Sequence, residues 1–167
     1  NAVTQGAVLF TDLVGFTEYN EAVGDRSAVE TLDRQQELVA PVVDKVSGAR
    51  VVKELCDGLM VWFPSAADGF LGAGSMLTAL GRAHEVGHFP LGIRMGLHRG
   101  DVVVRGTDLV GRTVNVAARI SALAGPGELV VSDIVAAACP AAALAPIGPT
   151  RLRGVSEPIW LHRASFE

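Results

Sequence analysis

The hydrophobic residues of this chain form short runs and spaced patterns that predict different elements. Residues 8–13 are a mainly apolar run that reaches an acidic residue near its end and is followed by Gly15. This pattern predicts a buried strand followed by a turn. Residues 28–46 instead place leucines and valines at helical spacing, and Gly48 lies two residues beyond them. The second pattern predicts a helix that ends before this glycine.

Two pairs of apolar segments lie close enough in sequence to form hairpins. Short segments rich in Asp and Gly separate the members of each pair, and these residue types favour turns. The predicted hairpins pair residues 50–55 with 59–63 around a turn at 56–58, and residues 91–98 with 102–105 around a turn at 99–101.

The remaining periodic segments predict further helices and strands. Hairpins interleaved with helices indicate an α+β fold, in which helices pack on a sheet of mixed direction. No repeat or linker divides the sequence, so we expect one domain over residues 1–167. The further helices are predicted at residues 66–85, 112–124 and 133–139, and the further strands at 128–132, 143–152 and 159–163.

The composition is that of a globular domain, with 49% hydrophobic and 19% charged residues. A net charge of −4 gives no basic surface of the kind that nucleic-acid binding needs. No apolar run is long enough to span a membrane, and we expect no membrane contact by this domain. Cys56 and Cys139 are too few for a disulfide framework, which favours a reducing, cytoplasmic location. Membrane tethering of a longer protein is left open.

The first candidate site lies at the end of the first predicted strand, in the sequence FTDLVGFT at residues 10–17. Backbone N–H groups at a helix start, here at Gly15, Phe16 and Thr17, can hold phosphate oxygens. A carboxylate beside them, Asp12, is placed to hold a metal ion that shares those phosphates. The alternative interpretation is that Asp12 caps the helix.

The second candidate site is the turn of the first hairpin, in the sequence KELCDG at residues 53–58. Acidic residues are common in turns, so Asp57 could be a turn residue only. Asp12 and Asp57 both lie at strand ends, however, and neighbouring strands would bring the two carboxylates together. Mg²⁺ is typically held by one or two carboxylates together with substrate phosphates.

The third candidate site lies in the predicted helix at residues 112–124. Asn115 and Arg119 are four residues apart and therefore share one helix face. An amide and a guanidinium suit an anionic, oxygen-rich transition state. The alternative is that both are surface residues without a role.

Taken together, these segments resemble the catalytic domain of class III adenylyl and guanylyl cyclases. The resemblance extends from about Val8 to His162 and rests on four motifs in the right order, since any one of them is weak. It implies the ferredoxin-like, mainly antiparallel sheet of that family. The motifs are FTDLVGFT, VKELCDG, GLHRGDVV and DLVGRTVNVAARI, and the closing RLRGVSEPIWLHR is also similar.

The resemblance implies a role for each matching residue in converting ATP to cyclic AMP and pyrophosphate with two divalent cations, Mg²⁺ or Mn²⁺. It also implies a homodimer with two shared sites, each taking its metal ligands from one subunit and its other residues from the partner. Asp12, Asp57 and the Leu13 carbonyl would bind the metals; Lys53 and Asp108 would read adenine; Asn115 would orient the ribose; Arg119 would stabilise the transition state.

Two positions depart from the family pattern. Cys56 replaces the usual glycine before the second metal ligand, and a positive φ there would strain the backbone by roughly 1–2 kcal/mol. The family often has a phosphate-binding lysine before its last strand; here Arg153 is the better candidate, and Val155 cannot serve. We expect His98, in GLHRG, to be structural.

Two alternatives to an adenylyl cyclase remain. A guanylyl cyclase usually has an acid at the position of Lys53 and a small residue or Cys at that of Asp108, so this chain carries the adenine pair. A pseudo-cyclase, which would bind nucleotide without turnover, usually lacks a metal-binding Asp or the transition-state Arg. All six matching positions are filled here, and Cys56 is the reason to retain this alternative.

Overall fold

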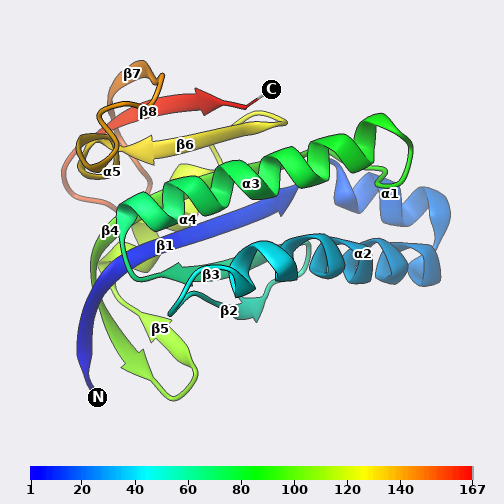
Figure 1. Ribbon diagram of the computed structural model, residues 1–167, viewed down its shortest axis with the longest axis horizontal. Helices are drawn as coiled ribbons and strands as arrows, with labels where there is room; N and C mark the ends of the chain where they lie inside the picture. Colours follow the sequence, from blue (N-terminus) through cyan, green and yellow to red (C-terminus); the bar gives the residue numbers. More distant parts are fainter. Residues whose placement is uncertain (167) are drawn as a thin grey trace.

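The centre of the molecule is an eight-stranded sheet, in a computed structural model that describes residues 1–166 (Figure 1). The strand order is β2-β3-β1-β4-β6-β8-β7, and β5 pairs with β4. Only the β4–β6 pair is parallel among the described strands, which confirms the predicted mixed, mainly antiparallel α+β sheet. The strands are β1 (Val3–Leu13), β2 (Arg50–Glu54), β3 (Gly58–Phe63), β4 (Ile93–Arg105), β5 (Asp108–Val110), β6 (Glu128–Ser132), β7 (Ala145–Thr150) and β8 (Ile159–Ser165).

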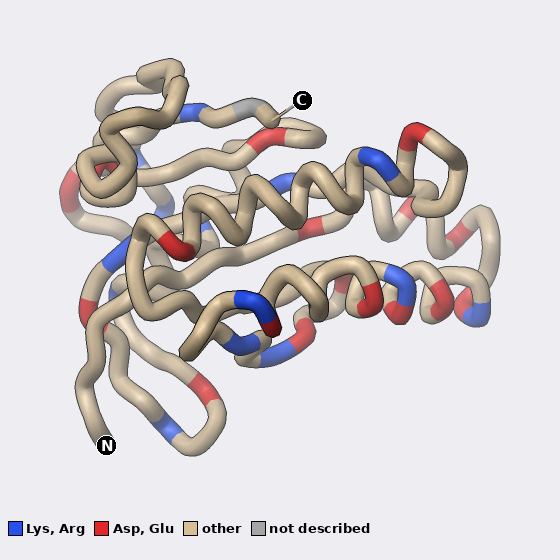
Figure 2. The backbone as a smooth tube through the Cα atoms, in the orientation of Figure 1, with Lys and Arg blue, Asp and Glu red and all other residues tan. Residues whose placement is uncertain are grey.

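Helices cover both faces of this sheet. In Figure 1, α2 and α3 lie side by side along one face, and α4 lies on the other. Charged residues of both signs are interleaved along α2 (Figure 2). None of the helices within residues 1–166 has the length and apolar character needed to cross a bilayer. The helices are α1 (Phe16–Val23), α2 (Asp25–Asp44), α3 (Ala66–Glu85), α4 (Arg112–Ser121) and α5 (Asp133–Ala138).

From Gly6 onward, strand β1 is buried on both sides because alternate residues enter two different hydrophobic clusters. Ala7 and Leu9 pack in the cluster beneath α2 and α3, whereas Val8 and Phe10 pack in the cluster beneath α4. The side chains of successive residues point to opposite faces of a sheet, so a doubly covered strand needs a continuous apolar run. The Asp12 side chain continues the Val8 and Phe10 series and therefore lies on the α4 face.

The predicted hairpin around residues 99–101 is wrong, because β4 continues straight through these residues. Arg99 and Asp101 pair with β1 in an unbroken antiparallel register. Gly100 permits the close approach of α4, since a Cβ at this position would meet the side chain of Thr113. The turn lies further along the chain, at Gly106, where φ is 62°. A polar Arg-Gly-Asp segment resembles a turn in sequence, but here it belongs to a paired strand.

Candidate functional site

Two carboxylates meet where β1 ends and the β2–β3 turn begins. Asp12 pairs with Gly58 across the β1–β3 register, which places Asp57 beside it. The backbone N–H of Leu13 donates to the carbonyl of Asp57 over 3.2 Å. The Asp12 carboxyl group is close enough to that of Asp57 to influence its pKa. The convergence of Asp12 and Asp57 expected from the sequence is therefore present. No side-chain hydrogen bond caps the start of α1, so Asp12 does not cap this helix.

The electrostatics of this pair favour a bound cation. Burial, together with the neighbouring Asp12 carboxyl group, raises the pKa of Asp57 from its ordinary value to about 6. Two carboxylates that repel each other in this way fit a divalent cation, which removes the repulsion. Within residues 1–166 no cluster of three or more His, Cys, Asp or Glu side chains forms a metal site. A metal held here would therefore rely on two carboxylates together with backbone carbonyl or non-protein oxygens.

Arg94 is a third member of this cluster that the sequence analysis did not identify. It lies opposite Asp12 in the β1–β4 register, and its Nε and Nη2 atoms are 2.7 Å and 2.6 Å from Oδ2 of Asp12. Its positive charge also acts to lower the pKa of Asp57. The available signal in the sequence was a lone arginine within the predicted apolar strand at residues 91–98.

Cys56 does not strain the turn. No residue other than glycine has a positive φ among residues 1–166, so the strain considered for Cys56 is absent. Its side chain is exposed. Backbone strain at Cys56 therefore gives no support to the alternative that the domain is an inactive pseudo-cyclase.

Lys53 and Asp108 form an ion pair although 55 residues separate them in sequence. Lys53 lies on β2 and Asp108 begins β5, and their Nζ and Oδ2 atoms are 3.1 Å apart. The other carboxylate oxygen of Asp108 accepts the backbone N–H of Leu109 over 2.8 Å. This backbone bond, followed by the bond from Lys53, lowers the pKa of Asp108. An ammonium donor and a charged carboxylate acceptor thus lie side by side.

Helix α4 presents Asn115 and Arg119 to solvent. Val116 and Ile120, on the neighbouring face of the helix, are fully buried, which fixes the rotation of the helix. Asn115 and Arg119 are both exposed on one face, as the spacing predicted. Within residues 1–166 no hydrogen bond or ion pair joins either of them to Asp12 or Asp57.

The remaining candidates occupy less specific positions. Gly15 is the residue before α1, and β1 ends two residues earlier, at Leu13. The first backbone N–H groups of α1, those of Phe16 and Thr17, therefore lie just beyond the end of β1. Arg153 is exposed, whereas Val155 packs against a hydrophobic cluster. The phosphate-binding role of these segments stays a prediction.

His98 has the surroundings of a structural residue. Its Nδ1 atom is 2.7 Å from Oγ of Ser132, and its side chain is buried. Burial and the positive charge of Arg112 lower its pKa to about 4, against an ordinary value of 6.5.

The lowered pKa of His98 predicts a loss of stability in acid. Between pH 6.5 and 4 the unfolded chain takes up a proton at His98 that the folded chain does not, so the free energy of unfolding falls as the pH falls. From pH 7 to pH 5 we expect His98 to contribute a loss of about 2 kcal/mol. Urea unfolding of the wild type and His98→Gln at both pH values isolates this contribution, because all other groups titrate in both proteins. An equal pH dependence in the two proteins would contradict the assignment.

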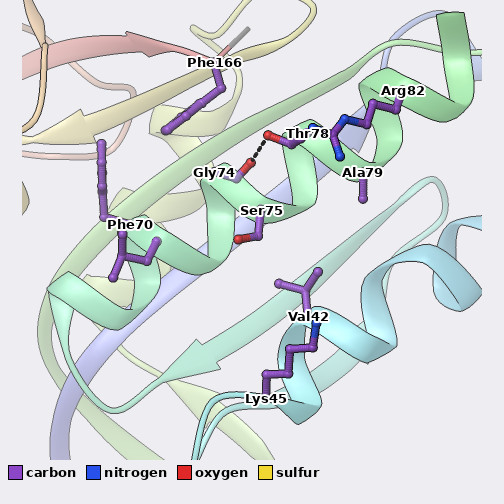
Figure 3. Close-up of a pocket in the computed structure, with 10 residues that line it drawn as sticks. Val42, Lys45, Phe70, Gly74, Ser75, Thr78, Ala79, Arg82 and Phe166 are labelled. Carbon is purple, nitrogen blue, oxygen red and sulfur yellow. Dashed lines mark hydrogen bonds between the residues drawn. The ribbon is translucent and has the colours of Figure 1, made fainter.

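A groove lies away from these residues, between α2 and α3 on the opposite face of the sheet (Figure 3). It has a volume of about 480 Å³. Lys45 and Arg82 line it together with the aromatic rings of Phe70 and Phe166. It contains none of the candidate site residues.

Comparison with known proteins identifies a family of enzymes. The family model described as the adenylate and guanylate cyclase catalytic domain matches residues 2–161. The chain is 32% identical over 173 residues to the pH-sensitive adenylate cyclase MT1302 of Mycobacterium tuberculosis, covering 95% of this chain and 40% of that protein. The chain spans less than half the length of the curated relatives it matches. It covers 40% of this adenylate cyclase and 19% of the serine/threonine-protein kinase pkn2 of Myxococcus xanthus, to which it is 29% identical.

Solved structures share the fold over almost the whole chain. The adenylyl cyclase CyaB from P. aeruginosa has a TM-score of 0.84 at 21% identity, covering 99% of this chain and 96% of that one. The guanylate cyclase domain of RhGC from Catenaria anguillulae, in complex with GTP, has a TM-score of 0.88 at 17% identity and covers 100% of both chains. Both base specificities therefore occur on this fold.

Proposed function

Because this chain belongs to the family of adenylate and guanylate cyclase catalytic domains, we propose that residues 1–167 form an adenylyl cyclase that converts ATP to 3′,5′-cyclic AMP and pyrophosphate. The observation that carries the choice of base is the Lys53–Asp108 pair, with its atoms 3.1 Å apart. The ammonium donates to a ring nitrogen of adenine, and the carboxylate accepts from the exocyclic amine. Guanine presents a carbonyl where adenine has this amine, and a carboxylate repels it.

Asp12, Asp57 and the Leu13 carbonyl would hold two divalent cations, Mg²⁺ or Mn²⁺. When bound, the cations would neutralise the phosphates and lower the pKa of the ribose 3′-hydroxyl. The backbone N–H groups at Gly15, Phe16 and Thr17 bind phosphate oxygens.

Residues of α4 act on the reacting centre. Asn115 orients the ribose so that its 3′ oxygen faces the α-phosphorus. The 3′ oxygen loses its proton to solvent and forms a bond to this phosphorus, while the bond from the phosphorus to the β-phosphate oxygen breaks and pyrophosphate leaves. Arg119 stabilises the negative charge that develops on the phosphate oxygens.

We propose that the active form is a homodimer with two shared sites. Asp12 and Asp57 of one subunit act with Lys53, Asp108, Asn115 and Arg119 of its partner. The exposed face of α4 supports this arrangement, since no hydrogen bond or ion pair joins Asn115 or Arg119 to either aspartate in the described part of one chain. A single chain then supplies two half-sites.

Guanylyl cyclase activity is the second candidate function, favoured by the likeness to the RhGC domain. The residues at positions 53 and 108 argue against it. A pseudo-cyclase is disfavoured because the two metal-binding candidates, Asp12 and Asp57, lie together and Cys56 has an unstrained backbone.

Removal of either metal-binding carboxylate is expected to abolish turnover while the fold persists. Asp12→Asn and Asp57→Asn should each lower kcat by about a thousandfold or more, because the cations supply the charge that both reacting oxygens require. Formation of cyclic AMP from ATP with Mn²⁺ measures this effect, and circular dichroism checks the fold.

Glu54→Gln is the matched control, because Glu54 is an exposed carboxylate on the same hairpin. This variant should keep wild-type turnover. Substantial activity of Asp57→Asn, or of the wild type in excess chelator, would remove the metal assignment.

A further inference from the structure

The turn that carries Asp108 is anchored on one side only: Leu109 is buried in the cluster beneath α4, whereas the residues before Asp108 lie at the surface. Strand β5 is three residues long and, within the described chain, forms its ladder with β4. Residues 105–107, which join β4 to β5, are exposed. The side chain of Asp108 is 42% exposed. The exposed connection at residues 105–107 therefore needs contacts from outside the hairpin to hold one geometry.

Two side chains of β2 supply such contacts. Nη1 of Arg50 donates to the backbone carbonyl of Thr107 over 2.9 Å, and Nζ of Lys53 donates to Asp108 over 3.1 Å. The first bond holds the peptide unit that leads directly into Asp108. The second bond holds the carboxylate itself.

A β-bulge makes both contacts possible. Residues three apart in a regular strand point to opposite faces of the sheet. The register shifts between Val51 and Lys53, so Arg50 lies opposite Trp62 and Lys53 lies opposite Met60. Trp62 and Met60 are two residues apart on β3 and share one face. Arg50 and Lys53 therefore both reach the β4–β5 turn.

We propose that Arg50 is a positioning residue for base selection, which holds the Thr107 carbonyl and so keeps the Asp108 carboxylate beside Lys53. The inference rests on the proposed function, in which Lys53 and Asp108 read adenine. When these two side chains turn to the base, the bond between them no longer holds the turn. The bond from Arg50 goes to the backbone and persists. Arg50 itself touches neither base nor phosphate.

The test compares Arg50→Met, which cannot donate a hydrogen bond, with Arg50→Lys, which can. Arg34→Met is the control, because Arg34 is a partly exposed arginine on α2. In Arg50→Met the ratio of kcat/KM for ATP to that for GTP should fall about fivefold, mainly through a higher KM for ATP. Arg50→Lys should recover most of this ratio, and Arg34→Met should leave it unchanged.

A second readout does not depend on turnover. The carboxyl ¹³C resonance of Asp108 reports its pKa, which should rise towards the ordinary value in Arg50→Met as the carboxylate leaves Lys53 and the Leu109 N–H. Unchanged pKa and unchanged base ratio in Arg50→Met would overturn the inference. A loss of kcat at constant KM, with lower thermal stability, would also overturn it, because that result indicates a structural role alone.

The two proposals fail in different ways. A wild type without preference for ATP contradicts the proposed function. The Asp108 titration then still decides whether Arg50 positions the carboxylate.

Discussion

Mixing the Asp12→Ala chain with the Arg119→Ala chain is expected to restore turnover that neither chain has alone. In the heterodimer one site takes its metal ligands from the Arg119→Ala chain and Arg119 from the Asp12→Ala chain, so that site is intact. The second site carries both defects. Random association makes about half of the dimers mixed, so we expect about a quarter of wild-type activity.

The matched control is a mixture of the Asp12→Ala and Asp57→Ala chains. Both residues belong to the same half-site, so each site of this heterodimer lacks one metal ligand and the mixture should stay inactive. Cyclic AMP formation across a series of mixing ratios measures both cases. An inactive first mixture in which heterodimers are shown to form would contradict the shared site.

Base selectivity is expected to change when Lys53 and Asp108 are replaced together. Lys53→Glu offers an acceptor to the ring N–H and amine of guanine, and Asp108→Cys removes the carboxylate that repels its carbonyl. A site built to bond one base leaves polar groups unpaired against the other, so the ratio of GTP to ATP turnover should rise about a hundredfold or more in the double variant.

Each single variant should mainly lose ATP activity. In Lys53→Glu two carboxylates would face each other where the ion pair now lies, and in Asp108→Cys the amine of adenine loses its acceptor. Values of kcat/KM for both nucleotides in the wild type and the three variants decide the matter. An unchanged ratio in the double variant would mean that these residues do not read the base.

Local sequence patterns predicted the parts of the site that depend on neighbouring residues. The apolar run at residues 8–13 and the tight turn at residues 56–58 were sufficient to place Asp12 and Asp57 at strand ends. Helical spacing was sufficient to place Asn115 and Arg119 on one face. Each of these inferences uses the period of a single strand or helix.

Features that depend on strand register could not be predicted in this way. The contact of Arg94 with Asp12 requires the β1–β4 alignment of residues 82 apart in sequence. The reach of Arg50 to Thr107 requires a bulge that no local pattern marks. The wrong turn at residues 99–101 has the same origin, because pairing with β1 decides that β4 continues.

The most direct test of the central claim is the comparison of ATP and GTP as substrates of the purified wild-type protein with Mn²⁺. Product identity and kcat/KM should be measured for both nucleotides at equal concentrations of enzyme. The Lys53–Asp108 pair predicts cyclic AMP as the main product and a kcat/KM for ATP that exceeds that for GTP by about a hundredfold or more. Equal values, a preference for GTP, or no cyclic nucleotide from either substrate would contradict the assignment as an adenylyl cyclase.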